Sequence, residues 1–188
     1  MRDFELNKSP NLVCRNRSSL LIIDVQEKLL PVIDNPGIVD NLNRLLAGAG
    51  LFEIPVTVTE QYPRGLGKTI QQLHLANCCS SVLEKTTFSC REHGEHFQEL
   101  KRLGREQVVV SGIESHICVV QTCLDLVEMG LQVFLVVDAI GSRSSENTQV
   151  ARERLADAVV PLPTESVLFE WCETADNASF KELRQWVK

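Results

Sequence analysis

The sequence predicts a three-layer α/β sandwich in which helices cover both faces of a six-stranded, mostly parallel sheet. Short β-branched runs alternate with segments whose apolar residues recur at helical spacing, which is typical of strand–helix–strand units. The runs are continuously apolar, as strands buried on both faces of a parallel sheet are. A chain of 188 residues is also long enough to form one domain with a large core.

The elements follow one another in regular order after an N-terminal arm, residues 1–17, that lacks periodicity. Strands are expected at 19–23, 55–59, 80–85, 108–112, 132–138 and 158–162. Helices are expected at 37–50, 97–103, 117–127 and 146–156, with a C-terminal helix at 177–188. Right-handed crossovers between such strands give a Rossmann-like single domain over residues 1–188. Two roles are open for the C-terminal helix, capping the core and docking on a neighbouring subunit.

Three polar residues stand where predicted strands end. Asp24 ends the first strand, Lys85 ends the third, and Cys118 opens the helix after the fourth. The carboxyl ends of parallel strands share one edge, where ligands bind in α/β sheets. A carboxylate there can take a thiol proton, while an ammonium and a helix N-terminus lower the thiol pKa. The three side chains therefore form a candidate catalytic site.

Each of the three residues also has a purely structural interpretation, which is open at this point. Cys118 fits a packed core thiol, because free cysteine is among the most buried residue types. Asp24 fits a cap on the following turn or helix. Lys85 taken alone fits a solvated surface charge.

Composition excludes several classes of function. The formal net charge of −6 argues against nucleic-acid binding, which needs a basic surface. Seven cysteines, an odd number, favour a reducing compartment over a disulfide framework. No apolar segment is long enough for a bilayer, and the first residues lack a signal-peptide core. We expect a cytoplasmic protein with no membrane partner, and Arg15 and Arg17 leave mitochondrial import as the alternative.

Four motifs stand in order at Leu21–Gln26, Glu84–Ser89, Gly112–Val119 and Asp138–Arg143. With them the sequence resembles the isochorismatase-like cysteine hydrolases, a superfamily that includes nicotinamidases and N-carbamoylsarcosine amidohydrolase. The likeness extends over residues 20–162. It is strongest to the isochorismatase domain-containing branch, where Thr59–Pro63 also has a counterpart.

The resemblance implies a catalytic triad of Asp24, Lys85 and Cys118. The reaction it implies is cleavage of a non-peptide C–N bond in a small amide through a thioester acyl-enzyme. It further implies a cis peptide bond between Ile113 and Glu114, which aims the amides of Glu114 and Cys118 into an oxyanion hole. A small-molecule substrate and a homo-oligomer follow from the same likeness. The alternative is a binding or scaffold protein that kept the fold with weak turnover.

The resemblance does not extend to a catalytic metal. Metal-dependent nicotinamidases carry an aspartate and histidines after the second strand, where this sequence has Gln61, Tyr62 and Pro63. His93 and His96 lack a third ligand at suitable spacing and are expected on the surface. We therefore expect no metal and no other cofactor.

Tyr62, Phe88 and His116 are candidates for lining the substrate pocket, since pockets are largely apolar and aromatic. Each also has a purely structural interpretation. Tyr62 could only brace its loop, Phe88 could be a core residue, and His116 could be an exposed turn residue.

Overall fold

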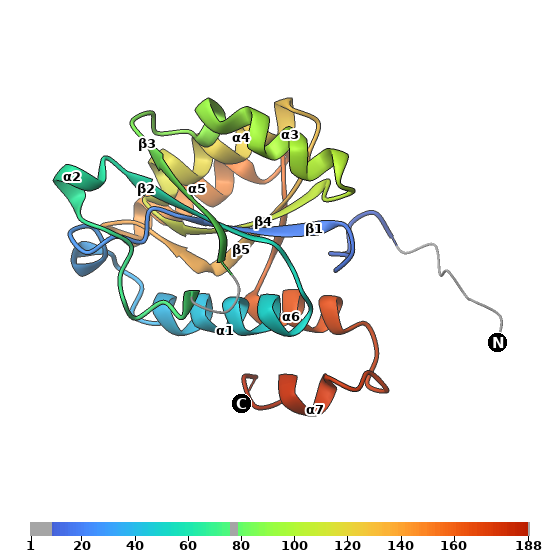
Figure 1. Cartoon of the computed structure of the whole chain (residues 1–188). Helices are drawn as coiled ribbons and strands as arrows, with labels where there is room; N and C mark the ends of the chain where they lie inside the picture. The colour runs from blue at the N-terminus through green and yellow to red at the C-terminus, as the bar shows by residue number, and fades with distance from the viewer. Residues whose placement is uncertain (1–8, 76–78, 188) are drawn as a thin grey trace.

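The computed structural model describes residues 9–75 and 79–187, and its centre is one six-stranded sheet (Figure 1). The strand order is β3–β2–β1–β4–β5–β6, and every neighbouring pair is parallel. The strands are β1 (Ser18–Ile23), β2 (Val56–Gln61), β3 (Cys79–Lys85), β4 (Gln107–Ile113), β5 (Gln132–Gly141) and β6 (Val160–Leu162). This order places the ends of β1 and β4 side by side at the centre of the sheet.

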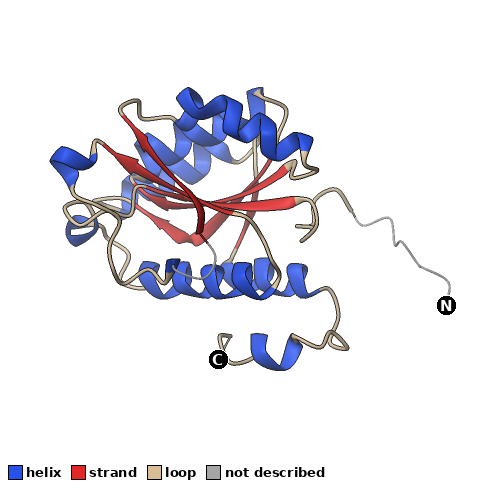
Figure 2. Cartoon of the chain, in the orientation of Figure 1, coloured by secondary structure: helices blue, strands red, loops and turns tan. Residues whose placement is uncertain are grey.

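Helices cover both faces of the sheet, which confirms the predicted fold class (Figure 2). One face carries α1 (Ile38–Leu51), α6 (Thr164–Cys172) and α7 (Phe180–Leu183). The other carries α3 (Gly94–Arg102), α4 (Val120–Glu128) and α5 (Ser145–Leu155). Short helical segments in the connections are η1 (Leu30–Val32), α2 (Pro63–Leu66), η3 (Cys90–His93) and η4 (Ser115–Val119).

Alternation along the strands divides the buried apolar residues into two cores, one on each face. In β1, Leu20 and Ile22 pack toward α1 and α6, whereas Leu21 and Ile23 join the core beneath α3, α4 and α5. All four are fully buried. The first strand is therefore anchored from both sides, which fixes the place where its end delivers Asp24.

The helix α6 was not expected from the sequence. Its buried residues Val167, Leu168 and Trp171 pack in the same core as α1. Gly48 of α1 permits this approach, because a Cβ there would lie 2.3 Å from Cδ2 of Leu168. The strand β5 also runs past its expected end to Gly141.

Both described ends of the chain pack onto the domain. In the N-terminal arm Val13 is fully buried, and the amide of Cys14 donates to Oε1 of Gln107 at 2.7 Å. At the other end Leu183 of α7 is fully buried, and Phe180 makes an edge-on contact with Phe169. Of the two roles open for the C-terminal helix, α7 therefore fills the first, capping the core. Over residues 9–75 and 79–187, no helix has the length and apolarity to cross a membrane.

Candidate active site

The carboxyl edge of the sheet brings Asp24, Lys85 and Cys118 together. Asp24 follows β1, Lys85 ends β3, and Cys118 lies in η4 directly after β4. Nζ of Lys85 is 2.7 Å from Oδ2 of Asp24, and both side chains are fully buried. Cys118 is only 5% exposed, and its thiol lies close enough to the same carboxylate for Asp24 to raise the thiol pKa. The juxtaposition expected from the strand ends is thus present in the structure.

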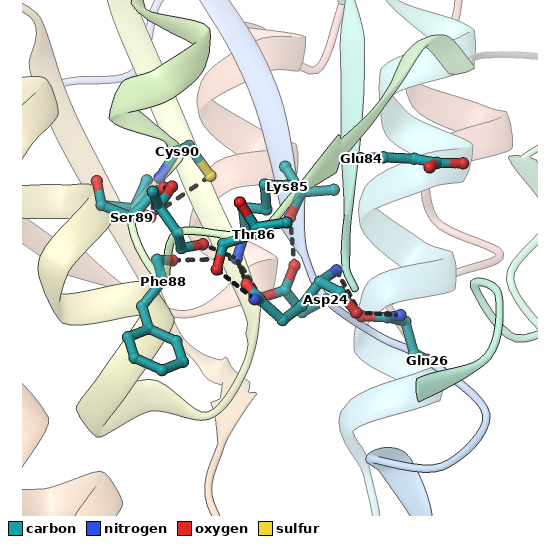
Figure 3. Close-up of polar contacts among 12 residues, drawn as sticks. Asp24, Gln26, Glu84, Lys85, Thr86, Phe88, Ser89 and Cys90 are labelled. Atoms are coloured by element: carbon teal, nitrogen blue, oxygen red, sulfur yellow. Dashed lines mark hydrogen bonds and ion pairs between the residues drawn. The ribbon is translucent and has the colours of Figure 1, made fainter. Parts of the chain in front are cut away.

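Lys85 is held as a buried ammonium by four oxygen acceptors (Figure 3). Besides Asp24, Oε1 of Gln61 lies at 2.7 Å, the carbonyl of Phe88 at 3.0 Å and that of Thr87 at 3.3 Å. A buried ammonium requires such partners, because its desolvation costs several kcal/mol. Lys85 is therefore not a solvated surface charge.

Asp24 adopts a left-handed backbone conformation with φ of 57°, which is uncommon for a residue with a side chain. Its Oδ1 accepts a hydrogen bond from the Thr59 hydroxyl at 2.7 Å, and its amide donates to the Thr59 carbonyl at 3.1 Å. Together with Lys85 these bonds satisfy both carboxylate oxygens. The orientation of the carboxylate toward the thiol is thereby fixed before any ligand binds.

Two glutamines that the sequence did not single out complete this polar network. The amide of Gln61 donates to Oε1 of Gln26 at 2.8 Å, and Nε2 of Gln26 donates to the carbonyls of Gln61 and Gly67 at 3.0 and 2.7 Å. Nε2 of Gln61 also donates to the carbonyl of Thr86 at 2.9 Å. Its Oε1 is consequently presented to Lys85.

The expectation of a lowered thiol pKa is wrong. Burial raises the pKa of Cys118, and the negative charge and hydrogen bond of Asp24 raise it further, while Lys85 opposes them. Cys118 also lies in η4, a π-helical turn that precedes α4, and not at the exposed start of a regular helix. The resting site therefore contains a protonated thiol next to a carboxylate.

The predicted cis peptide bond between Ile113 and Glu114 is also wrong, since none occurs in the part of the chain that the structure describes. Positive φ angles of 129° at Gly112 and 55° at Glu114 shape this turn. Only glycine fits the first position, because a Cβ there would lie 2.3 Å from the Ile23 carbonyl oxygen. The Cys118 amide donates to the Glu114 carbonyl at 3.0 Å, so the predicted oxyanion hole loses that donor. The Glu114 amide stays a predicted donor.

The side chain of Glu114 is buried against the end of β5. Its Oε1 is 2.9 Å from Nε of Arg143, while its Oε2 is 3.6 Å from Nδ1 of His116. Nδ1 of His116 is instead within hydrogen-bond distance, 3.0 Å, of the Ser142 hydroxyl. Oε2 of Glu114 and the hydroxyl of Ser115 are buried atoms without a hydrogen-bond partner among the described residues.

The two aromatic pocket candidates are surface residues at the rim of the site. Phe88 is 54% exposed and not part of the core, and its ring points away from Lys85, which its carbonyl binds (Figure 3). Tyr62 is 55% exposed and helps to line a cavity of about 350 Å³ with Lys85 and Glu92. The Tyr62 carbonyl also accepts the Gly65 amide at 2.9 Å, so the residue braces its loop as well. A substrate pocket role for these residues stays a prediction.

The turn that supplies carbonyls to Lys85 is held by Glu92. Its Oε1 accepts the amides of Thr86 and Thr87 at 3.0 and 3.3 Å and the Thr87 hydroxyl at 2.9 Å. A second anchor is the hydroxyl of Ser89, which donates to Oδ2 of Asp125 in α4 at 2.6 Å. The turn around Lys85 is thereby tied to the helix that follows Cys118.

Glu92→Gln is expected to lower the free energy of unfolding by about 1 kcal/mol, because charge-assisted hydrogen bonds to the turn are weakened. Urea unfolding measures this loss. Glu95→Gln, at an exposed position of the same segment, is the matched control and should change stability by less than about 0.5 kcal/mol. Equal effects of the two substitutions would contradict an anchoring role for Glu92.

Cys90 is a further buried thiol beside the site that the sequence did not single out. Burial raises its pKa to about 11, and it lies close enough to Asp24 and Lys85 to feel both charges. The hydroxyl of Thr122 accepts its amide at 3.1 Å. The only available sequence signal was its place just after the Glu84–Ser89 motif.

Within residues 9–75 and 79–187, no group of three or more histidine, cysteine, aspartate or glutamate side chains is arranged to hold a metal ion. His93 and His96 make separate contacts. The His93 ring contacts the Glu84 carbonyl, and the His96 ring contacts the Thr57 hydroxyl. Independence of a metal stays a prediction.

The parallel sheet with helices on both faces and a polar cluster at its carboxyl edge defines an α/β protein whose candidate site lies beyond the strand ends. Residues 18–166 match the isochorismatase domain family, and the chain therefore belongs to that family. Membership in this family confirms the resemblance inferred from the four motifs.

Named relatives share most of this chain. It is 39% identical over 167 residues to isochorismatase domain-containing protein 1 of Danio rerio, covering 88% of this chain and 59% of that protein. It is 38% identical over 174 residues to isochorismatase domain-containing protein 2B of Mus musculus, covering 91% and 81%. The structure of MAR1 ribonuclease from Caenorhabditis elegans superposes with a TM-score of 0.85 at 32% identity, covering 94% and 92%. The chain thus spans about three fifths of the first relative's length.

Proposed function

We propose that this protein is a cysteine hydrolase that cleaves a non-peptide C–N bond in a small amide, with Asp24, Lys85 and Cys118 as its triad. The observation that carries the proposal is the buried cluster in which the Asp24 carboxylate contacts the Lys85 ammonium at 2.7 Å and lies close enough to the Cys118 thiol to raise its pKa. Ion pairs cost free energy to bury, and active sites are where such arrangements shift protonation equilibria.

In the first half of the reaction Asp24 is the general base. Because the pKa of Cys118 is raised, the thiol keeps its proton until a carbonyl carbon is in place, and Asp24 takes that proton as sulfur attacks. Lys85 balances the negative charge that then spreads over the site. Asp24 next gives the proton to the nitrogen, the C–N bond breaks, and ammonia or an amine leaves a thioester on Cys118.

In the second half water hydrolyses the thioester. Asp24 is again unprotonated and takes a proton from the water as its oxygen attacks the acyl carbon. The C–S bond breaks, the sulfur regains the proton from Asp24, and a carboxylic acid leaves. The cycle requires no redox partner.

The proposal predicts that Cys118→Ala abolishes amide hydrolysis. A panel of small carboxamides and carbamoyl compounds is screened for ammonia release, and intact mass measures the covalent acyl adduct on the wild-type enzyme. The variant should lose at least about a thousandfold in rate and form no adduct, because removal of a nucleophile leaves only residual binding effects. Cys123→Ala, at a buried thiol of α4, is the control. Full activity in Cys118→Ala would refute the mechanism.

A binding or scaffold protein with weak turnover is the second candidate. Three properties of Cys118 favour it. The residue is 5% exposed, its raised pKa keeps the thiol protonated, and its amide already donates to the Glu114 carbonyl. The same amide panel distinguishes the two candidates. Saturable binding of a panel compound without ammonia release or an adduct would support the second.

We infer that RNA is not the substrate, although one structural neighbour is named a ribonuclease. The formal net charge of −6 opposes a polyanion, since nucleic-acid affinity depends on basic groups at the phosphates. Cleavage of a labelled RNA that is lost in Cys118→Ala would overturn this inference.

We also propose that the protein forms a homo-oligomer, as its family resemblance implies. A neighbour with the same fold, the YcaC gene product of Escherichia coli, is described as octameric, and at 22% identity its likeness to this chain is one of fold. Light scattering after size-exclusion chromatography tests the proposal.

A further inference from the structure

Two adjacent residues just before the nucleophile carry buried polar atoms that have no hydrogen-bond partner in the described chain. They are Oε2 of Glu114 and the hydroxyl of Ser115. Buried polar groups in folded proteins are almost always hydrogen-bonded, because an unpaired one costs about 1–3 kcal/mol. Both belong to the turn that ends at Cys118, whose amide donates to the Glu114 carbonyl. An unpaired acceptor in this place indicates a group that binds a ligand.

The neighbours of Glu114 define what such a ligand must offer. Arg143 holds Oε1 at 2.9 Å and compensates the charge of the carboxylate. His116 is 3.6 Å from Oε2, beyond hydrogen-bond distance, and its Nδ1 faces the Ser142 hydroxyl. Oε2 is thus an acceptor that is held in place with its charge balanced. A neutral N–H donor fits it better than a cation, which would add positive charge beside Arg143.

We infer that Oε2 of Glu114 and the hydroxyl of Ser115 form a subsite that binds the N–H of a carboxamide or ureido group of the substrate. This inference rests on the proposed function, because it takes Cys118 as the attacking group. It narrows the substrate to compounds whose N–H donor lies within a few bonds of the carbon that the sulfur attacks. Glu114 and Ser115 are in this view specificity-determining residues.

The subsite is tested with three alkylating probes of similar size that react at the Cys118 sulfur. Iodoacetamide carries a neutral N–H donor, methyl iodoacetate is neutral without a donor, and iodoacetate is anionic. Rates of Cys118 modification are measured by peptide mass mapping at one mildly alkaline pH. Each rate is divided by that of glutathione with the same probe, which removes intrinsic reactivity.

The wild-type protein should prefer iodoacetamide over methyl iodoacetate by about tenfold, the effect of one hydrogen bond to a charged acceptor. Iodoacetate should react more slowly than both. A preference below about twofold between the two neutral probes would overturn the inference without any variant.

Glu114→Gln replaces the acceptor of the proposed subsite by a donor. Arg143 requires an acceptor, so it holds the amide oxygen of the new side chain and turns the NH₂ group to the former place of Oε2. The preference for iodoacetamide should disappear or reverse toward the ester. Glu106→Gln is the matched control, since Glu106 pairs with Arg17 at 2.6 Å just before the other end of β4. It should keep the wild-type preference, and a folded Glu114→Gln that also keeps it contradicts the inference.

Ser115→Ala tests the proposed subsite if Glu114→Gln does not fold. Loss of an unpaired buried hydroxyl should leave the free energy of unfolding unchanged or slightly increased, while the iodoacetamide preference falls about fivefold. An unchanged preference in this variant contradicts the shared subsite. The ratio is measurable at any absolute rate, so a clear donor preference without amide hydrolysis contradicts the proposed function alone. Hydrolysis without a donor preference contradicts this inference alone.

Discussion

Lys85→Met is expected to lower the free energy of unfolding by about 3–5 kcal/mol, the cost of leaving a buried charge without its partner. Methionine approximates the length of the lysine stem but provides no donor for Asp24, Gln61 or the carbonyl of Phe88. These three acceptors and the Thr87 carbonyl, which Lys85 also binds, would then lose their hydrogen bonds at once. Urea unfolding at neutral pH measures the loss.

A double-mutant cycle separates the ion pair from the packing of the lysine stem. Asp24→Asn in the Lys85→Met background removes the unpaired charge, so the double variant should be more stable than Lys85→Met alone. Lys28→Met is the control, because Lys28 is an exposed lysine bound to the Gly65 carbonyl at 2.7 Å. Its effect should be below about 1 kcal/mol. A double variant less stable than Lys85→Met would show that the Asp24 charge is not the source of the cost.

The position of the site could be predicted from the sequence because it follows from topology. Asp24 and Cys118 follow strands and Lys85 ends one, and the ends of parallel strands share one edge of the sheet. No contact had to be known for that inference. The structure adds the distances, including 2.7 Å between Asp24 and Lys85.

The protonation state of the thiol could not be predicted in the same way. The direction in which the pKa of Cys118 shifts depends on the balance between burial, Asp24 and Lys85. That balance is set by contacts between segments that are distant in the sequence. A position at a helix N-terminus predicted a lowered pKa for Cys118, but the residue is buried in a π-helical turn. The acceptor role of Gln61 was hidden for the same reason, since the orientation of its side chain depends on the Thr86 carbonyl, to which its Nε2 donates.

The helix α6, which was not predicted, is a different case, because the apolar spacing that indicates a helix was present in the sequence. Val167, Leu168 and Trp171 recur at helical spacing and are the buried face of α6. The Ile113–Glu114 bond was expected to be cis by likeness alone. Here the left-handed conformation of Glu114 shapes the turn, and such backbone detail is not encoded in a residue pattern.

Asp24→Asn is expected to change alkylation and hydrolysis in opposite directions. Asp24 raises the pKa of Cys118 through its charge and its hydrogen bond, so its removal lowers that pKa. A nearby charge shifts a pKa by about 1–3 units, and thiolate at a fixed pH below the pKa rises about tenfold per unit. Alkylation of Cys118 by iodoacetamide should therefore become about ten- to a thousandfold faster at neutral pH. Peptide mass mapping across a pH series measures this change.

Hydrolysis by the same variant should fall, because asparagine can neither accept the thiol proton nor return it to the leaving nitrogen. Loss of a general base typically costs about a hundred- to ten-thousandfold in rate. Thr59→Val removes the hydroxyl that contacts Oδ1 of Asp24 and keeps the carboxylate, so it should impair hydrolysis far less. A structural aspartate whose loss unfolds the protein would also speed alkylation, but at the buried Cys123 as well as at Cys118. Faster alkylation of Cys118 with an unchanged rate at Cys123, combined with lost turnover, therefore distinguishes a proton carrier from a packing residue, and slower alkylation in Asp24→Asn would contradict the assignment.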